Sequence, residues 1–518
     1  MTTLSDAELF DLLGPEPPPG DPPPWEHQAR EFDEHKDDRF RVLLWSMRTG
    51  KSRAVIEKAE YQFSKGNVEG VIVVAPNGIH LNWIINEIPR WSKLPHKAFG
   101  WQAPLRGDWD KVAAADAIVE PYPGGLRWLT INMEAFGSDN DATRSVIKLV
   151  DRFKRSCNKK FMLVISEAHH FGHAGAKRTR LIKQLGNMAK FVTLETGTAI
   201  LNSPLRAYSI YKIGDDLALG PEYVGNKYES FVQRHANIVI VGPDGKPVST
   251  FNRRNRARKK VESYKNLDEL RDKIAPWSSV VLRSDVKDMP DLLRTERIIM
   301  LSEKQRKAYL EMVSRHLIEI EGRLDAPAPD AGARMIKLAQ ILKGFVKVED
   351  QIINIDEEAP VYQAMLDEVY GTLPGKTIIW CRFHEEVDRC MKILKFKKFR
   401  PLQFDGRVPT EKREGIRVAF NTDPRYNPLV GHPGAGGEGL NFGAADTVVF
   451  FSSTPNAIHV TQGEERGTEI GGNPVSVVRF RAPGTTDDRN WDIVDGKLVT
   501  AEIVTGRDLR DLLMQTNV

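Results

Sequence analysis

Short apolar runs separated by polar, helix-compatible stretches are the main pattern along this chain. In the first half, β-branched and aromatic residues are concentrated in runs at 41–45, 71–75, 126–131, 161–165 and 191–194. In the second half, the runs lie at 377–380, 401–404, 428–430, 447–451 and 475–480. Apolar strands that alternate with helices are typical of a parallel sheet covered on both faces. The pattern therefore predicts two α/β lobes.

The alternation stops between about residues 205 and 355. Runs at 237–241 and 246–250 flank Gly242-Pro-Asp-Gly245 and predict a hairpin. A basic run at 253–260 and mostly helical sequence follow. The predicted organisation is a Pro-rich leader at 1–24, lobe 1 at 25–212, a helical and basic insertion at 213–355, and lobe 2 at 356–518.

Composition is that of a soluble globular protein with several domains. The 518 residues are 41% hydrophobic and 28% charged, and the net charge is +4. This balance neither requires nor excludes a nucleic-acid partner, because a basic groove can be local. Cys157, Cys381 and Cys390 lack zinc spacing, and no apolar run reaches the ~18 residues of a membrane span. With no basic leader, we expect a cytoplasmic protein without membrane contact, or one in the host cytoplasm if a phage encodes it.

The segment Met47-Arg-Thr-Gly-Lys-Ser52 has the features of a phosphate-binding loop, because it joins an apolar run to a helical stretch. Backbone N–H groups at a helix start bind phosphates, Lys51 can reach the terminal phosphates, and the Ser52 hydroxyl can bind Mg²⁺. The strict pattern has a glycine six residues before the lysine, where this chain has Trp45. A chance Gly-Lys-Ser at a helix start is the alternative, but the strand–loop–helix order favours nucleotide binding.

A polar cluster, Ser166-Glu-Ala-His169, ends the apolar run at 161–165. In phosphoryl-transfer ATPases an aspartate at this strand end holds magnesium, and a further residue orients the attacking water. Glu167 can orient the water, and Ser52, Ser166 and Glu167 are the candidates for binding Mg²⁺, although Ser166 offers the ion only a hydroxyl. Two alternatives are a polar strand end in an unrelated fold and a metal site built from His169, His170 and His173, although no complementary ligand set is evident.

Further segments match, in order, the motifs of one family. In the first half these are Glu26-His-Gln28, Ala75-Pro-Asn77, Thr196-Gly-Thr-Ala199 with Asn202, and the stretches 281–290 and 301–309. In the second half these are 378–383, 405–421, Gly434-Ala-Gly-Gly-Glu-Gly-Leu-Asn441 and 462–471. With these motifs the chain resembles a superfamily-two DEAH-type helicase/ATPase of the SWI/SNF-like branch of double-stranded DNA translocases, of phage or bacterial type.

The resemblance implies an α/β fold of two RecA-like parallel-sheet lobes with helical insertions, and ATP with Mg²⁺ between the lobes. It implies that Glu167, Lys51 and Arg466 are catalytic, with Arg466 reaching the γ-phosphate across the lobe interface, and that Gln28 recognises adenine. The remaining nucleotide-binding candidates are Arg48, Thr49, Gly50, Ser52, Gly437 and Gln462. The candidates for nucleic-acid contact are Pro76, Asn77, Thr198, Asn202, Arg382 and Gly436, together with Arg253, Arg254 and Arg256 of the basic run. That basic run could equally be a solvated face.

Two positions depart from the family pattern. Ser166 replaces the magnesium-holding aspartate, and Glu469 stands where the family has a second arginine, three residues after Arg466. A cross-lobe arginine can contribute about 10³–10⁵ in turnover. Three explanations stay open: hydrolysis is weak, another residue such as Arg466 or Arg413 substitutes, or Ser166 is an engineered change that traps an ATP-bound state.

The expected function is an ATP-dependent motor that moves along double-stranded DNA, its hydrolysis weakened by Ser166 and Glu469. One rival is a non-hydrolysing, ATP-gated DNA clamp, which the two departures favour. The other is a strand-separating DNA or RNA helicase, against which the branch-specific stretches around Arg283 and Gln305 argue.

Overall fold

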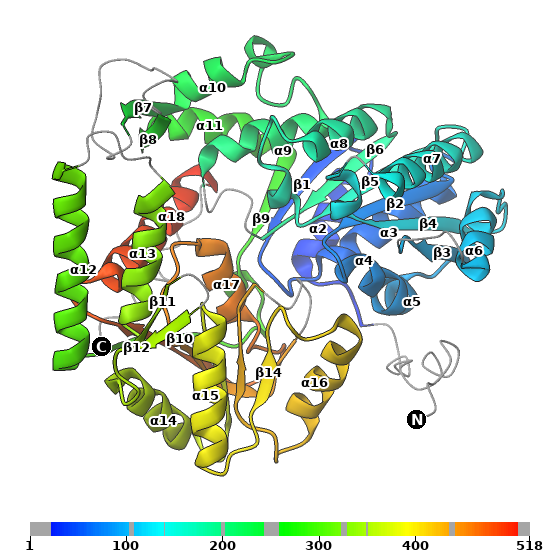
Figure 1. The fold of residues 1–518 in the computed structure, drawn as a ribbon. Helices are drawn as coiled ribbons and strands as arrows, with labels where there is room; N and C mark the ends of the chain where they lie inside the picture. The colour runs from blue at the N-terminus through cyan, green and yellow to red at the C-terminus, as the bar shows by residue number, and fades with distance from the viewer. Residues whose placement is uncertain are drawn as a thin grey trace.

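A computed structural model of the chain describes residues 22–102, 108–138, 140–197, 203–242, 258–322, 329–348, 351–434 and 441–505. Its two parallel sheets form two lobes (Figure 1). None of the helices in these ranges has the length and hydropathy needed to span a membrane.

Lobe 1 is built on a seven-stranded sheet in the order β3-β4-β2-β5-β6-β1-β9, with every neighbouring pair parallel. Its strands are β1 (Phe40–Trp45), β2 (Gly70–Ala75), β3 (His96–Gly100), β4 (Leu126–Asn132), β5 (Phe161–Ser166), β6 (Phe191–Glu195) and β9 (Ser278–Val281). Its helices are α2 (Glu26–His35), α3 (Lys51–Ser64), α4 (Ile79–Asn82), α5 (Ile88–Trp91), α6 (Trp109–Val119), α7 (Asp141–Ser156), α8 (Lys177–Met188), α9 (Ala207–Gly214), α10 (Tyr228–His235) and α11 (Leu267–Ile274).

Alternate side chains of each central strand enter different cores of lobe 1. In β1, Val42 and Leu44 belong to one buried cluster, while Leu43 and Trp45 belong to another. Side chains alternate between the faces of a strand, so a sheet covered on both faces requires apolar residues at every position. The continuous apolar runs of the sequence are the result.

Lobe 2 is built on a six-stranded parallel sheet in the order β10-β17-β16-β13-β15-β14. Its strands are β10 (Leu292–Ile298), β13 (Lys376–Trp380), β14 (Leu402–Phe404), β15 (Leu429–Gly431), β16 (Ala445–Phe450) and β17 (Val475–Arg481). Its helices are α14 (Pro360–Thr372), α15 (His384–Phe396), α16 (Thr410–Thr422), α17 (Ala457–Glu465) and α18 (Thr486–Thr505). The prediction of two parallel α/β lobes is confirmed.

The segment predicted as a helical insertion at 213–355 is partly β-structure. Strand β9 extends the sheet of lobe 1 beside β1, and β10 extends the sheet of lobe 2 beside β17. Both are edge strands, and β10 buries only alternate residues at its start, so neither has the continuous apolar run of a central strand. The edge strand β3 of lobe 1 escaped prediction for the same reason.

The predicted hairpin has a different second strand. Strand β7 (Ala236–Val241) pairs antiparallel with β8 (Arg258–Tyr264), whereas the predicted partner at 246–250 lies outside the described residues. Because β8 begins with Arg258, Lys259 and Lys260, the end of the basic run belongs to a strand. Its polar composition hid it from a search for apolar runs.

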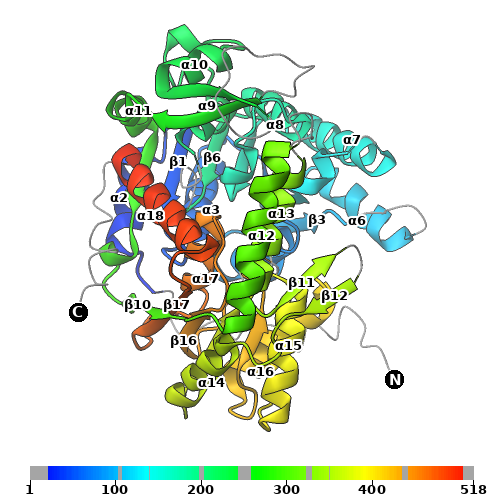
Figure 2. The same ribbon diagram turned by 60° about the vertical axis from the view of Figure 1, so that its left-hand side comes forward.

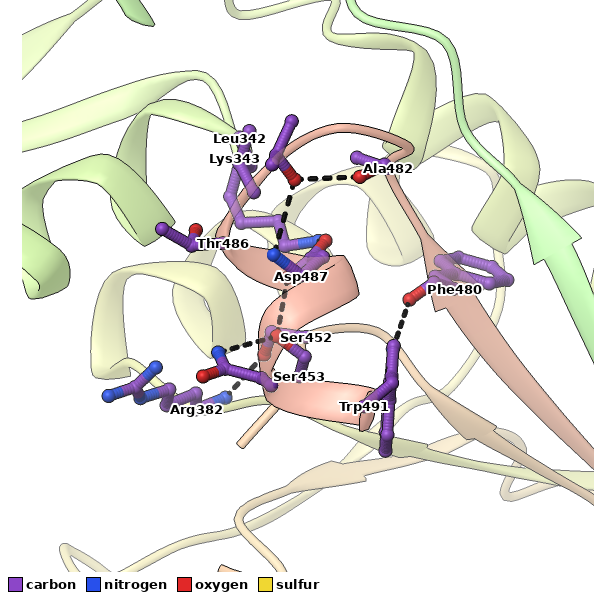
Figure 3. Close-up of polar contacts among 12 residues, drawn as sticks. Leu342, Lys343, Arg382, Ser452, Ser453, Phe480, Ala482, Thr486, Asp487 and Trp491 are labelled. Atoms are coloured by element: carbon purple, nitrogen blue, oxygen red, sulfur yellow. Dashed lines mark hydrogen bonds and ion pairs between the residues drawn. The ribbon is translucent and has the colours of Figure 1, made fainter. Parts of the chain in front are cut away.

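Two helices, α12 (Glu303–Gly322) and α13 (Pro329–Ile341), lie side by side (Figure 2), and a small hairpin of β11 (Phe345–Val348) and β12 (Gln351–Asn354) follows them. Gln305 Nε2 of α12 donates to the carbonyl oxygens of Ile341 and Leu342 at 3.1 and 2.8 Å. Lys343 then forms a buried ion pair with Asp487 of α18 at 3.3 Å, beside Ser453 (Figure 3). The helical pair is thereby attached to lobe 2.

Helix α18 joins the cores of both lobes. Near its start, Trp491 and Val494 lie in a buried cluster of lobe 2, and Trp491 Nε1 donates to the carbonyl oxygen of Phe480 (Figure 3). In its last turn, Val504 is fully buried in a cluster of lobe 1 that includes Leu270 of α11. The helix is therefore anchored at both ends.

Candidate nucleotide-binding site between the lobes

The loop between β1 and α3 has the geometry of a phosphate-binding loop. Gly50 has φ +76° and caps α3 without a side-chain hydrogen bond to the first turn. The Thr49 hydroxyl donates to the carbonyl oxygen of Ser46 at 2.8 Å, and Lys51 Nζ donates to those of Trp45 and Ser46 at 2.9 and 3.0 Å. In the part of the chain that the structure describes, Gly50 gives the first N–H groups of α3 no side-chain cap, which leaves them as donors for phosphate oxygens.

Side chains of helix α2 contact the backbone of this loop. The His27 ring nitrogen Nε2 lies 2.7 Å from the Thr49 carbonyl oxygen, and Gln28 Nε2 donates to the Gly50 carbonyl oxygen at 2.9 Å. Gln28 Oε1 also accepts from the Trp25 backbone N–H at 2.8 Å. Both ends of the buried Gln28 amide therefore bind backbone, and its predicted recognition of adenine stays a prediction.

Two neighbouring strand ends carry polar side chains towards the loop. Ser166 ends β5 and Glu195 ends β6, and the two residues are directly paired in register. Glu195 is 1% exposed, and burial raises the pKa of its carboxyl to about 8, although Lys51 and a hydrogen bond with Ser166 act in the opposite direction. Glu195 is not among the residues predicted from the sequence, where its local signal is an acid directly after the run at 191–194 and its pairing with Ser166 is not visible.

Two further glutamates lie at this end of the sheet. Glu167 has φ +57°, and its carboxylate Oε2 lies 3.2 Å from His169 Nδ1. Glu87, at the end of the π-helical turn Trp83–Glu87, accepts a hydrogen bond from the Ser52 hydroxyl, and burial raises its pKa. Carboxylates thus lie close to both serines that the sequence proposed as magnesium ligands.

The phosphate-binding loop contacts lobe 2 directly. Arg48 donates to Thr468 Oγ1 and to the carbonyl oxygen of Arg466, both at 3.2 Å. Arg283, in the connection between the two sheets, donates to the same Thr468 oxygen at 2.9 Å. Burial lowers the pKa of Arg48 to about 10, and burial also raises the pKa of the nearby Glu465. We call Arg48, Arg283 and Thr468 the seam.

Comparisons with known proteins agree with this geometry. Residues 361–470 match the family model "Helicase conserved C-terminal domain". The chain is 26% identical over 471 residues to an uncharacterized ATP-dependent helicase of Mycoplasma genitalium, covering 89% of this chain and 40% of that protein. It is 25% identical over 359 residues to the DNA annealing helicase and endonuclease ZRANB3 of Bos taurus, covering 68% of this chain and 30% of that protein. Over most of its length, the chain is therefore similar to ATP-dependent helicases.

Two further similarities concern a longer curated protein and a solved structure of similar length. It is 22% identical over 395 residues to the TATA-binding protein-associated factor MOT1 of Saccharomyces cerevisiae, covering 66% of this chain and 20% of that one. It is also similar to the solved SWI2/SNF2 ATPase core of Sulfolobus solfataricus in complex with dsDNA, at 16% identity and a TM-score of 0.38, covering 97% of this chain and 99% of that chain. The chain spans less than half the length of the curated relatives named here, and the resemblance found from its motifs is confirmed.

The arginine predicted to reach the γ-phosphate lies inside lobe 2. Arg466 is 1% exposed and its guanidinium lies 5.6 Å from the centre of the Trp380 ring. Its carbonyl oxygen meets Arg48, while Gln462 is buried one helical turn earlier. Glu469 is exposed and lies close to Gly443, so it is not buried at the seam. The catalytic role of Arg466 stays a prediction.

The predicted nucleic-acid residues are only partly covered by the structure. Asn77 is exposed after β2, whereas Pro76 is buried and its carbonyl oxygen accepts from Ile79 at the start of α4. The Arg382 backbone N–H donates to Ser452 at 2.8 Å, and its side chain points away from that cluster (Figure 3). The other candidates lie outside the described residues: Thr198, Asn202, Arg253, Arg254, Arg256, Gly436 and Gly437. None of the predicted DNA contacts is tested by the structure.

Proposed function

We propose that this protein is an ATP-dependent motor that moves along double-stranded DNA. The observation that carries the proposal is the seam, where the phosphate-binding loop of lobe 1 meets the end of α17 in lobe 2. A nucleotide held by that loop lies where its presence changes the contact between the lobes. Such a change in contact is how nucleotide binding can drive lobe motion.

The residues of the loop fit a nucleoside triphosphate. The uncapped start of α3 offers N–H donors, and Lys51 needs only a side-chain rotation away from two carbonyl oxygens to reach a phosphate. Magnesium would be held near Ser52, Ser166 and Glu167, where it would neutralise charge on the phosphates. Glu167 would accept a proton from, or orient, the attacking water.

Double-stranded DNA is the partner that the motifs and relatives favour. The name of the Bos taurus relative states that it is a DNA annealing helicase, and the motif order of this chain resembles the DNA-translocating branch. Asn77 and Arg382 directly follow parallel strands of the two lobes, β2 and β13 respectively. Backbone contacts from such positions are independent of DNA sequence, so we expect binding that weakens steeply with salt.

The decisive experiment measures ATP turnover with and without duplex DNA, for this chain and for Ser166→Asp. Stimulation by duplex DNA supports the motor. Displacement of a triplex-forming strand without separation of duplex strands would identify translocation, whereas strand separation would identify a helicase that unwinds. No turnover in either protein, with or without DNA, would overturn the motor.

A DNA clamp gated by ATP is the second candidate. It is favoured by Ser166 at the metal-binding strand end and by the position of Arg466, whose guanidinium lies over Trp380 within lobe 2. A clamp would bind duplex DNA more tightly with ATP than without, and would release no phosphate. Measuring DNA affinity and phosphate release in the same sample separates the clamp from the motor.

A further inference from the structure

The carboxylate that is missing from the end of β5 is present on the neighbouring strand. Ser166 and Glu195 are paired in the parallel register of β5 and β6. Residues paired in this way project from the same face of a sheet, on strands about 4.8 Å apart. A glutamate side chain is one methylene longer than that of an aspartate, so it can reach from β6 towards the place that an aspartate on β5 would serve.

Strand β6 is also closer to the phosphate-binding loop than β5 is. The sheet order places β6 between β5 and β1, and β1 leads into the loop. Directly after Glu195, the Thr196 backbone N–H donates to the Leu43 carbonyl oxygen at 3.0 Å. A Cβ atom on Gly197 would lie 3.0 Å from the Trp45 carbonyl oxygen, so this segment packs tightly against the end of β1. Glu195 therefore lies beside the start of the loop.

The buried Glu195 side chain has only part of its hydrogen-bonding capacity filled. The side chain is 1% exposed, and in the described part of the chain its Oε1 has no hydrogen-bond partner. Lys51 is near enough to influence it electrostatically, but Lys51 Nζ is bonded to the carbonyl oxygens of Trp45 and Ser46. A buried carboxylate without a full set of partners is costly, and a bound divalent ion removes that cost.

We propose that Glu195 supplies the carboxylate for nucleotide-bound magnesium, with the Ser166 hydroxyl beside it as a secondary, uncharged partner. The inference rests on the proposed binding of ATP by the loop. Magnesium in such sites is held by one or two carboxylates and keeps several waters, so a cage of protein ligands is not needed. The described residues contain no cluster of three or more acidic, histidine or cysteine side chains that could hold a metal alone.

Metal-dependent nucleotide binding tests this assignment without relying on turnover. The full chain is titrated with a fluorescent ADP analogue in Mg²⁺ and in EDTA, and the paramagnetic resonance spectrum of Mn²⁺ is recorded in the presence of ADP. The variants are Glu195→Gln, which keeps shape and removes charge, and Glu195→Gln combined with Ser166→Asp, which returns a carboxylate to β5. Glu60→Gln is the control, because Glu60 is also a buried glutamate of lobe 1 but binds Ser92, Lys93 and Leu94.

We expect Glu195→Gln to lose about tenfold or more of the affinity gained from Mg²⁺ and to release bound Mn²⁺, while affinity in EDTA stays unchanged. The double variant should recover most of the loss, and Glu60→Gln should show none. Thermal unfolding separates a purely structural role, because loss of a structural acceptor lowers stability and leaves the Mg²⁺ effect intact. Unchanged Mn²⁺ spectra in Glu195→Gln would overturn the inference while nucleotide binding stands. Absence of nucleotide binding in every condition would overturn the proposed function as well.

Discussion

Replacing Glu464 with glutamine should destabilise lobe 2 more than any exposed charge change. Glu464 on α17 is 4% exposed and lies between two arginines, Arg294 of β10 and Arg479 of β17. Its carboxylate accepts from Arg294 at 2.9 and 3.2 Å and from Arg479 at 3.1 Å. Burial acts against ionisation, but the two guanidiniums hold the pKa of Glu464 below its ordinary value.

The size of the effect follows from the charges that the substitution leaves behind. Removing one partner of a buried ion pair costs about 3–5 kcal/mol. Arg479 keeps its ion pair with Asp495 at 3.0 Å, so we expect Glu464→Gln to cost about 3 kcal/mol, near the lower end. For a unit of about 200 residues, this corresponds to a fall in Tm of roughly 6–12 °C.

Calorimetry of the intact chain measures this change, with Glu296→Gln as a matched control. Glu296 also pairs with an arginine of β17, Arg481, at 3.0 Å, but its side chain is 34% exposed. Loss of an exposed pair costs about 0–1 kcal/mol. Equal destabilisation by the two variants would refute the reasoning, because it would show that burial of the triad does not matter.

The loss of stability in Glu464→Gln should depend on pH. The folded-state pKa of Glu464 is lowered, so its contribution to stability is present above the ordinary glutamate pKa of about 4.3 and disappears as pH falls through the folded value. The difference in stability between the chain and Glu464→Gln should therefore be largest near neutral pH and should shrink in acid. A difference that grows below pH 4 would contradict the direction of the shift.

Two other substitutions test the loop and the seam, and a third tests Lys58, a buried lysine of α3 that donates to the carbonyl oxygens of His35 and Asp38. Gly50→Ala should abolish nucleotide binding in a fluorescence titration, because φ is +76° and the new Cβ would lie 2.1 Å from Gln28 Nε2. Thr468→Val removes the hydroxyl that accepts from both seam arginines, and each lost hydrogen bond to a charged group costs about 1.5–3 kcal/mol. The inter-lobe distance measured by fluorescence energy transfer should increase, while the Tm of either lobe alone should not fall. Burial lowers the pKa of Lys58 to about 8, so the free energies of unfolding of Lys58→Met and of the unmodified chain should differ most below pH 8. As pH rises from 8 towards 10.5, chemical denaturation should show the unmodified chain gaining stability relative to Lys58→Met.

Central strands were predictable from sequence, whereas of the edge strands only β14 was. A central strand such as β5 is buried on both faces, so its sequence is apolar at every position. Strands β3, β9 and β10 have one neighbour and partly exposed faces, and their sequences resemble loops. Pairing with a distant strand, rather than local composition, makes them strands.

The candidate site shows the same limit. Lys51 and Ser52 could be placed because a phosphate-binding loop is a continuous segment with a local geometry. Glu195 could not be placed in this way, because its role depends on its pairing with Ser166. The two residues lie on β5 and β6, and the end of β5 is 25 residues from the start of β6. The sequence alone does not show that these two strands pair. The burial of Arg466 over Trp380 likewise arises from packing between α17 and β13, which a motif cannot express.

The double anchoring of α18 restricts the ways in which the two lobes can move apart. The lobes are linked once by the chain segment between β9 and β10 and a second time by α18, whose Val504 lies in the core of lobe 1. Two fixed points define an axis, so any motion that keeps both intact is a rotation about the line that joins them. Straight separation of the lobes would have to extract Val504 from its cluster, at about 1.5–3 kcal/mol for a buried valine side chain. The last turn of one helix thus limits the directions in which the two lobes can move relative to each other.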